Sequence, residues 1–172
     1  MIDSRRRRTE PAPAVLPVEP SEAQEIQSLS GLSPIQYREA FAVQLTANGS
    51  AEEWARLLLE GATPRKRAAM LTTWGLLRLK LGPPGSPDHV LGWRVRSRSD
   101  DAVVLAVRNG PGLEARIVLT ASDHRLVHTM VVHNDHWYWR LLWAALAPKH
   151  RSFVRGLLQD LVDRTQADVP QH

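Results

Sequence analysis

The last third of the chain decides the fold, and residues 134–164 read NDHWYWRLLWAALAPKHRSFVRGLLQDLVDR. Apolar side chains recur there at steps of one, three and four, which places them on one face of a helix. This face comprises Trp139, Leu142, Trp143, Leu146, Phe153, Val154, Leu157, Leu158 and Leu161. Asn134 or Asp135 could cap the first turn, because a short side-chain oxygen accepts the free N–H groups there. We therefore predict a long amphipathic helix.

Four strand-like runs lead directly into this helix. They cover residues 91–99, 102–108, 113–120 and 126–133, and residues typical of turns separate them. In the first run Arg94, Arg96 and Arg98 alternate with apolar or small residues, which predicts that the arginines line a watery face. Runs joined by such short turns predict an antiparallel meander.

Another strand and two helices are expected earlier in the chain. Residues 37–46 alternate with strand period, which we favour over a helix starting at Ser33-Pro34. Ser50 and Glu53 form a capping box for a helix that Gly61 ends. A second helix is expected from Thr63-Pro64 to Gly82, followed by a proline-rich loop over residues 83–87. Its apolar face comprises Met70, Leu71, Trp74, Leu77 and Leu81.

The chain divides into one domain with two tails. The four prolines between residues 11 and 20 predict an unstructured N-terminal tail over residues 1–33. A domain over residues 34–166 and a short tail over residues 167–172 follow. The order β-α-α-β-β-β-β-α predicts an α+β fold of helix-grip (START-like) type. In it a curved antiparallel sheet surrounds the long C-terminal helix, helices lie on one face, and a cavity remains where the helix does not fill the curve.

The composition and the distribution of charge limit the kinds of partner that we expect this protein to bind. Arg5–Arg8 supply the whole net charge of +4, so the folded part has no excess charge and nucleic-acid binding is disfavoured. These arginines could touch anionic lipid weakly, although a solvated tail is the simpler reading. No apolar run has membrane-spanning length, and the arginines precede no apolar signal segment, so we expect a cytoplasmic protein. The absence of cysteine excludes disulfides and thiolate chemistry.

Several pieces of the chain resemble one family of proteins. They are Tyr37–Leu45, Glu53-Trp54-Ala55, Val90–Trp93, His133-Asn134 and Pro148–Arg151. Over residues 37–164 the chain resembles the family DUF2867, within the helix-grip superfamily of START and polyketide-cyclase-like proteins (SRPBCC). The resemblance implies an apolar ligand between the sheet and the last helix, and some members of the superfamily catalyse cyclisation or hydrolysis there. It supplies no catalytic residues, and the Asp135-His136-Trp137 that follows His133-Asn134 replaces the family's usual glycine-arginine turn.

His150 and His128 are the only candidates for acid–base chemistry, and both are weak. His150 continues the apolar stripe of the last helix, so it could donate a proton or bind a polar ligand group. The alternative is a structural histidine bonded to a carbonyl group near Pro148. His128 and His133 face opposite sides of a strand, and with His124 and His136 they offer no convergent metal site. We therefore assign no catalytic residue, metal or cofactor.

Tryptophan is unusually abundant, with six residues against two phenylalanines. Tryptophan offers a large apolar wall and one N–H group that can orient a ligand, although these rings could simply fill the core or meet a partner. The ligand-binding residues predicted from the sequence are Trp93, Val95, Ile117, His128, Met130, Trp139, Trp143 and His150. Three hypotheses follow: a binding module for a small apolar or amphipathic ligand, a cyclase- or hydrolase-like enzyme of the same fold that uses His150 or His128 as acid or base, and an interaction protein with a filled core.

Overall fold

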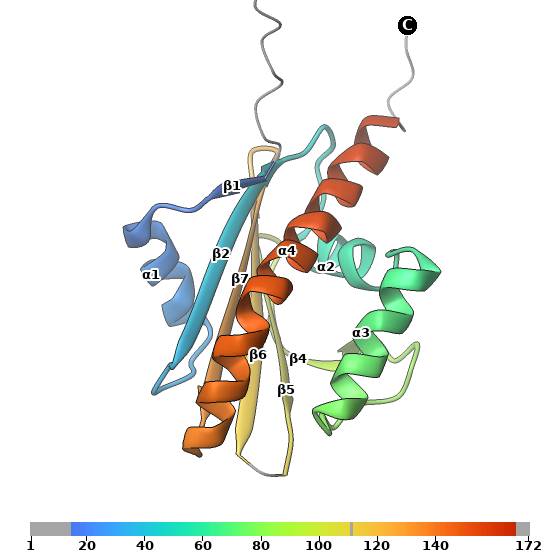
Figure 1. Cartoon of the computed structure of the whole chain (residues 1–172). Helices are drawn as coiled ribbons and strands as arrows, with labels where there is room; N and C mark the ends of the chain where they lie inside the picture. The colour runs from blue at the N-terminus through green and yellow to red at the C-terminus, as the bar shows by residue number, and fades with distance from the viewer. Residues whose placement is uncertain (1–14, 111, 168–172) are drawn as a thin grey trace, which may run out of the picture.

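The computed structural model describes residues 15–110 and 112–167, which form an α+β fold (Figure 1). A seven-stranded antiparallel sheet has the strand order β1-β2-β7-β6-β5-β4-β3, and a long helix lies across it. This arrangement is compatible with a helix-grip-like fold. The elements in chain order are β1 (Val15–Pro17), α1 (Pro20–Leu29), β2 (Tyr37–Gln44), α2 (Ala51–Leu59), α3 (Pro64–Leu76), β3 (His89–Val90), β4 (Trp93–Arg98), β5 (Ala102–Arg108), β6 (Leu113–Ser122), β7 (Arg125–Asn134) and α4 (Trp137–Ala167).

The predicted meander is confirmed, since β4, β5, β6 and β7 pair in sequence order. The predicted strand over residues 37–46 is also confirmed as β2, which pairs with β7. The sheet face that carries Phe41, Leu105, Ile117 and Met130 packs against α2 and α4 in the main core. This core exists because alternate apolar residues of every long strand point to the same side of the sheet.

Helix α4 is continuous, although Pro148 lies inside it. The predicted apolar stripe is buried at Trp143 and in the second half of the helix, whereas Leu142 is exposed. The prediction that Asn134 caps this helix is wrong. Asn134 is the last residue of β7, the helix begins only at Trp137, and neither polar atom of the Asn134 side chain has a hydrogen-bond partner in the described part of the chain.

The prediction of an unstructured segment over residues 1–33 is wrong for residues 15–33. Strand β1 extends the sheet, and α1 covers the opposite sheet face (Figure 1). Pro20 is tolerated because the first position of a helix needs no N–H partner. Helices therefore lie on both faces, against the expectation of one, and Glu22 of α1 forms an ion pair with Arg125 of β7. Residues 1–14, including Arg5–Arg8, and residues 168–172 of the predicted C-terminal tail lie outside the described residues.

Two local expectations also need correction. A bulge in β4 shifts the register between Val95 and Ser97, so Arg98 turns to the helix side and meets Glu52 of α2 at 3.3 Å. The predicted row of three arginines on one face is thus broken. Helix α3 ends at Leu76, short of the predicted Gly82, because Arg78 adopts the left-handed backbone conformation that usually follows a helix.

Helix α2 begins at the predicted capping box, in which Ser50 accepts from the Glu53 backbone N–H and the Glu53 carboxylate accepts from that of Ser50. Trp54 and Leu58 are buried against the sheet, and the Trp54 indole donates to the carbonyl of Gly49. These contacts fix α2 over the centre of the sheet, at one side of the region described below. Within residues 15–110 and 112–167, no helix is long and apolar enough to cross a membrane.

Candidate functional site

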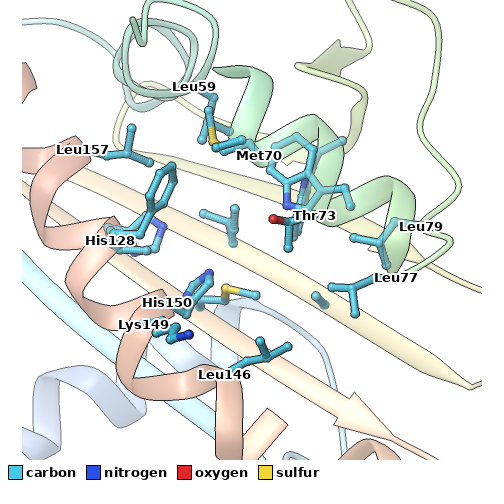
Figure 2. Close-up of a pocket in the computed structure, with 18 of the residues that line it drawn as sticks. Leu59, Met70, Thr73, Leu77, Leu79, His128, Leu146, Lys149, His150 and Leu157 are labelled. Atoms are coloured by element: carbon cyan, nitrogen blue, oxygen red, sulfur yellow. The ribbon is translucent and has the colours of Figure 1, made fainter. Parts of the chain in front are cut away.

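A cavity of about 300 Å³ lies between α3, α4 and the sheet. Figure 2 shows side chains from the two helices facing each other across this space, with strands beneath. The cavity exists because α3 packs loosely, and Met70 is the only one of its residues that is buried. At one end Lys66 of α3 bonds Asp160 and the Gly156 carbonyl of α4, at 2.7 Å and 2.9 Å. This contact ties the two helices together beside the cavity.

The cavity wall is mainly apolar. The sheet contributes Trp93, Leu113, Ala115, Ile117, His128 and Met130, and α2 contributes Leu58 and Leu59. Helix α3 and the residues after it contribute Ala69, Met70, Thr73, Trp74, Leu77 and Leu79. Helix α4 contributes Trp143, Leu146, Lys149, His150, Phe153, Val154 and Leu157. An enclosure of this kind suits a ligand with a large apolar surface.

The structure brings six of the eight predicted ligand-binding residues to this cavity. They are Trp93, Ile117, His128, Met130, Trp143 and His150. Val95 and Trp139 do not line it, although both pack partly buried against the main core. Val95 lies next to the bulge near the edge of the sheet, and Trp139 lies one turn before the part of α4 that borders the cavity. The helical or strand period predicted which face of its helix or strand each residue occupies. It did not predict which part of that face borders the cavity.

A buried polar cluster joins β2 to α4 beside the cavity. His150 Nδ1 lies 2.9 Å from Glu39 Oε1, at ion-pair distance but away from the direction of a well-aligned hydrogen bond. The other carboxylate oxygen of Glu39 accepts from the Tyr37 hydroxyl at 2.6 Å. Arg151 in turn donates to the Tyr37 oxygen and lies over its ring. The contact with Glu39 gives His150 a structural partner. His150 also lines the cavity, so a role toward a ligand stays a hypothesis beside the structural one.

Burial and neighbouring charges shift the pKa values of Glu39, His128 and Tyr37. Burial would raise the pKa of Glu39, but the His150 contact and the Tyr37 hydrogen bond outweigh it and hold this pKa below its usual range. Burial lowers the pKa of His128 to about 4, although the Glu39 charge opposes this shift. At neutral pH the cavity floor therefore carries an uncharged imidazole beside an ionised, buried carboxylate. Burial and Glu39 also raise the pKa of Tyr37, so its hydroxyl stays protonated.

Several polar atoms of cavity-lining residues have no partner in the described part of the chain. They are the indole N–H groups of Trp93 and Trp143 and Nδ1 of His128. A buried polar atom without a hydrogen bond costs about 1–3 kcal/mol, so such atoms call for an explanation. Because all three belong to residues that line the same cavity, a group inside the cavity is a natural partner for them.

Glu39 is the site residue that sequence reasoning missed. It stands in register with Phe41, Val43 and Leu45 in the alternating run, so the sequence already placed a carboxylate on the buried face of β2. Its side chain is only 1% exposed. A charged residue on the apolar face of a strand is rare unless it is paired, and that mismatch was the available signal.

The other histidines considered as metal ligands, His124, His133 and His136, lie away from the cavity. His133 donates through Nδ1–H to the Pro34 carbonyl and contacts the Asp135 carboxylate through Nε2, both at 2.8 Å. His124 occupies the β6–β7 turn, and His136 is exposed and stacks on Tyr138. Among the residues that the structure describes, no three His, Asp or Glu side chains converge in a way that could hold a metal ion.

Comparisons with protein-family models, with curated proteins and with solved structures find no match to this chain. The resemblance to the family DUF2867 therefore stays a prediction. The cavity, the Glu39–His150 pair and the buried His128 are the observations from which a function has to be argued.

Proposed function

We propose that this protein binds a small apolar or amphipathic molecule in the cavity between the sheet, α3 and α4. The cavity itself is the observation that supports the proposal. Its volume of about 300 Å³ falls at the lower end of the range for small-molecule sites. Leucine, methionine and tryptophan side chains form most of its wall, so transfer of an apolar body from water into it is favourable.

The arrangement of α3 supports binding rather than a filled interior. A helix with one buried residue leaves apolar neighbours such as Leu59, Ile117 and Met130 without close packing partners on the cavity side. A void lined by apolar groups forfeits dispersion contacts that a ligand restores. The hypothesis of an interaction protein with a filled core lacks this support.

Titration with the neutral fluorescent probe N-phenyl-1-naphthylamine tests the proposal, together with native mass spectrometry for a co-purified small molecule. Thr73 lines the cavity from α3 and is itself exposed, so the larger side chain of Thr73→Trp should fill the space and abolish probe binding. Thr72→Trp is the matched control, because the neighbouring Thr72 is exposed and does not line the cavity. Equal binding by both variants, or no binding by the unmodified protein, would contradict the proposal.

A second candidate function is an enzyme of hydrolase-like type that uses His150 as a general base. The observation that favours it is the Glu39–His150 contact at the cavity wall, because a carboxylate on one ring nitrogen orients the imidazole and stabilises its protonated form. His150 Nε2 would take a proton from water while the water oxygen attacks an ester carbonyl. The ester C–O bond would then break, and the imidazolium would return the proton to the leaving alcohol or phenol oxygen. His128 is the alternative base, but its low pKa makes it a weak one.

Hydrolysis of aryl esters with apolar acyl groups separates the two functions. An enzyme should lose turnover in His150→Gln and still bind N-phenyl-1-naphthylamine as before. A pure binding protein should show no turnover above the rate of His150→Gln. Turnover that survives in this variant would exclude His150 as the base.

A further inference from the structure

The polar groups of the cavity are not spread evenly over its wall. Figure 2 shows His128, Lys149 and His150 on the α4 side, across from the α3 side. Of the side chains labelled on the α2 and α3 walls, which are Leu59, Met70, Thr73, Leu77 and Leu79, only Thr73 carries a polar atom. Trp74 of α3 and its ring neighbour Trp93 add only indole N–H donors, so every titratable side chain of the wall lies on the side of β7 and α4. A ligand that fits this distribution has an apolar body toward α2 and α3 and one polar end toward β7 and α4.

His128 is the central polar group at that end. His128 is only 3% exposed and lines the cavity from β7. Its Nδ1 has no hydrogen-bond partner among the described residues. The indole N–H of Trp143, on α4, is likewise buried and unpaired. The cavity thus presents at least one fixed donor and one imidazole nitrogen that can accept or donate, depending on its tautomer.

The charges around His128 determine which polar group of a ligand can bind at this end of the cavity. Glu39 is an ionised carboxylate, and the His150 ring 2.9 Å from it can supply at most one positive charge, which this carboxylate would already balance. His128 is uncharged at neutral pH because its burial lowers its pKa to about 4. Lys149, the remaining cation of the wall, is exposed. An anionic group beside His128 would therefore face a buried carboxylate without a cation of its own, which is unfavourable.

A hydroxyl group satisfies these conditions better than a carbonyl group. A hydroxyl can accept from an indole N–H and pair with the imidazole nitrogen in either tautomer, whereas a carbonyl oxygen pairs only with a tautomer that donates. We propose, building on the cavity-binding function, that the ligand is a neutral apolar molecule bearing a hydroxyl group, such as a phenol or an alcohol, and that His128 hydrogen-bonds this hydroxyl inside the cavity.

Three naphthalene derivatives of nearly equal size test this inference. Naphthalene lacks a polar group, 2-naphthol carries a neutral hydroxyl, and 2-naphthoate carries an anion at neutral pH. Calorimetric titration should give 2-naphthol an affinity about threefold to tenfold above that of naphthalene, which corresponds to the net value of one hydrogen bond. 2-Naphthoate should bind more weakly than 2-naphthol.

The variant His128→Leu should remove the preference for 2-naphthol and leave the affinity for naphthalene within about twofold, since it removes the hydrogen bond and keeps an apolar wall. His136→Leu is the matched control, because His136 is exposed and does not line the cavity. It should keep the preference. If His128→Leu does not fold, the ligand series on the unmodified protein decides alone.

The outcomes distinguish this inference from the function on which it rests. Equal affinities for naphthalene and 2-naphthol, or the tightest binding for 2-naphthoate, would overturn the hydroxyl assignment and keep the cavity-binding function. A preference that survives in His128→Leu would overturn the role of His128. No binding of any of the three compounds would overturn both proposals.

Discussion

Acidification should destabilise this protein through His128, and the variant His128→Leu should be less sensitive to acid. In the folded state, burial lowers the pKa of this imidazole to about 4. In the unfolded chain it returns to the ordinary value of 6.5. Between these two values the unfolded state binds a proton that the folded state excludes, so stability falls as the pH falls.

The size of the effect follows from the two pKa values. At about pH 4.5 the unfolded chain is almost fully protonated at His128, and the folded protein is mostly not. Linkage then gives a loss of about 2 kcal/mol relative to pH 7, which is large against the total stability of a domain of this size. Glu39 of β2 and His150 of α4 are the titratable groups that act on His128, and Lys149 of α4 also borders the cavity.

Urea unfolding followed by tryptophan fluorescence, at pH 7 and at about pH 4.5, measures the effect. Other carboxylates and histidines also titrate in this range, including Glu39, whose lowered pKa makes it a stabilising group that is lost only at lower pH. The comparison of the acid-induced loss between the unmodified protein and His128→Leu cancels their contributions to first order. His136→Leu, at an exposed histidine, serves as the control.

The expected result is an acid-induced loss about 2 kcal/mol smaller in His128→Leu than in the unmodified protein or in His136→Leu. Equal losses in all three would show that His128 titrates normally in the folded state. The imidazole would then be solvated, and the argument for a neutral group on the cavity floor would fail with it.

Two further predictions concern the helices around the cavity. Ser50→Ala should lower the free energy of unfolding by about 1 kcal/mol in urea titrations, because it removes the capping box of α2, and Ser122→Ala at the exposed end of β6 should have no effect. Lys66→Met should cost less than about 1 kcal/mol, since the Lys66–Asp160 pair is partly exposed. It should nevertheless speed the release of N-phenyl-1-naphthylamine in stopped-flow experiments, because the tie between α3 and α4 is lost; an unchanged release rate would mean that this contact does not control access.

The sequence predicted the strands of the sheet more accurately than the helix α1, the β4 bulge and the cavity. In β6, Leu113, Ala115, Ile117 and Leu119 occupy alternate positions and reach the main core as the pattern predicted, although Val118 on the other face is buried as well. Asn109 with Gly112 marked the turn before this strand. The capping box of Ser50 and Glu53 located α2 for a similar reason, because two reciprocal hydrogen bonds need those residue types at that spacing. Six of the eight predicted ligand-binding residues line the cavity, because the helical or strand period determines which face of its helix or strand a residue occupies.

The remaining features depend on contacts that a local pattern does not contain. Helix α1 is short and weakly apolar, and it is held by long-range contacts such as Glu22–Arg125 and the hydrogen bond from Arg116 to the Ser30 carbonyl. The β4 bulge reverses Arg98 without any change in the sequence alternation. The cavity itself depends on how far apart α3 and α4 lie, which no periodicity specifies.

Stability alone does not explain the Glu39–His150 pair. A buried ion pair pays a large desolvation penalty, and replacement of both partners by apolar residues of similar size is often neutral or stabilising by about 1–4 kcal/mol. We therefore expect Glu39→Met/His150→Leu to be at least as stable as the unmodified protein, whereas His150→Leu alone should be clearly destabilised because the Glu39 carboxylate, only 1% exposed, loses its partner. If the pair serves the ligand, the double variant should also discriminate less against 2-naphthoate relative to 2-naphthol, since the charge of Glu39 near His128 would be gone. A double variant that is much less stable would instead assign the pair to the architecture of the β2–α4 contact.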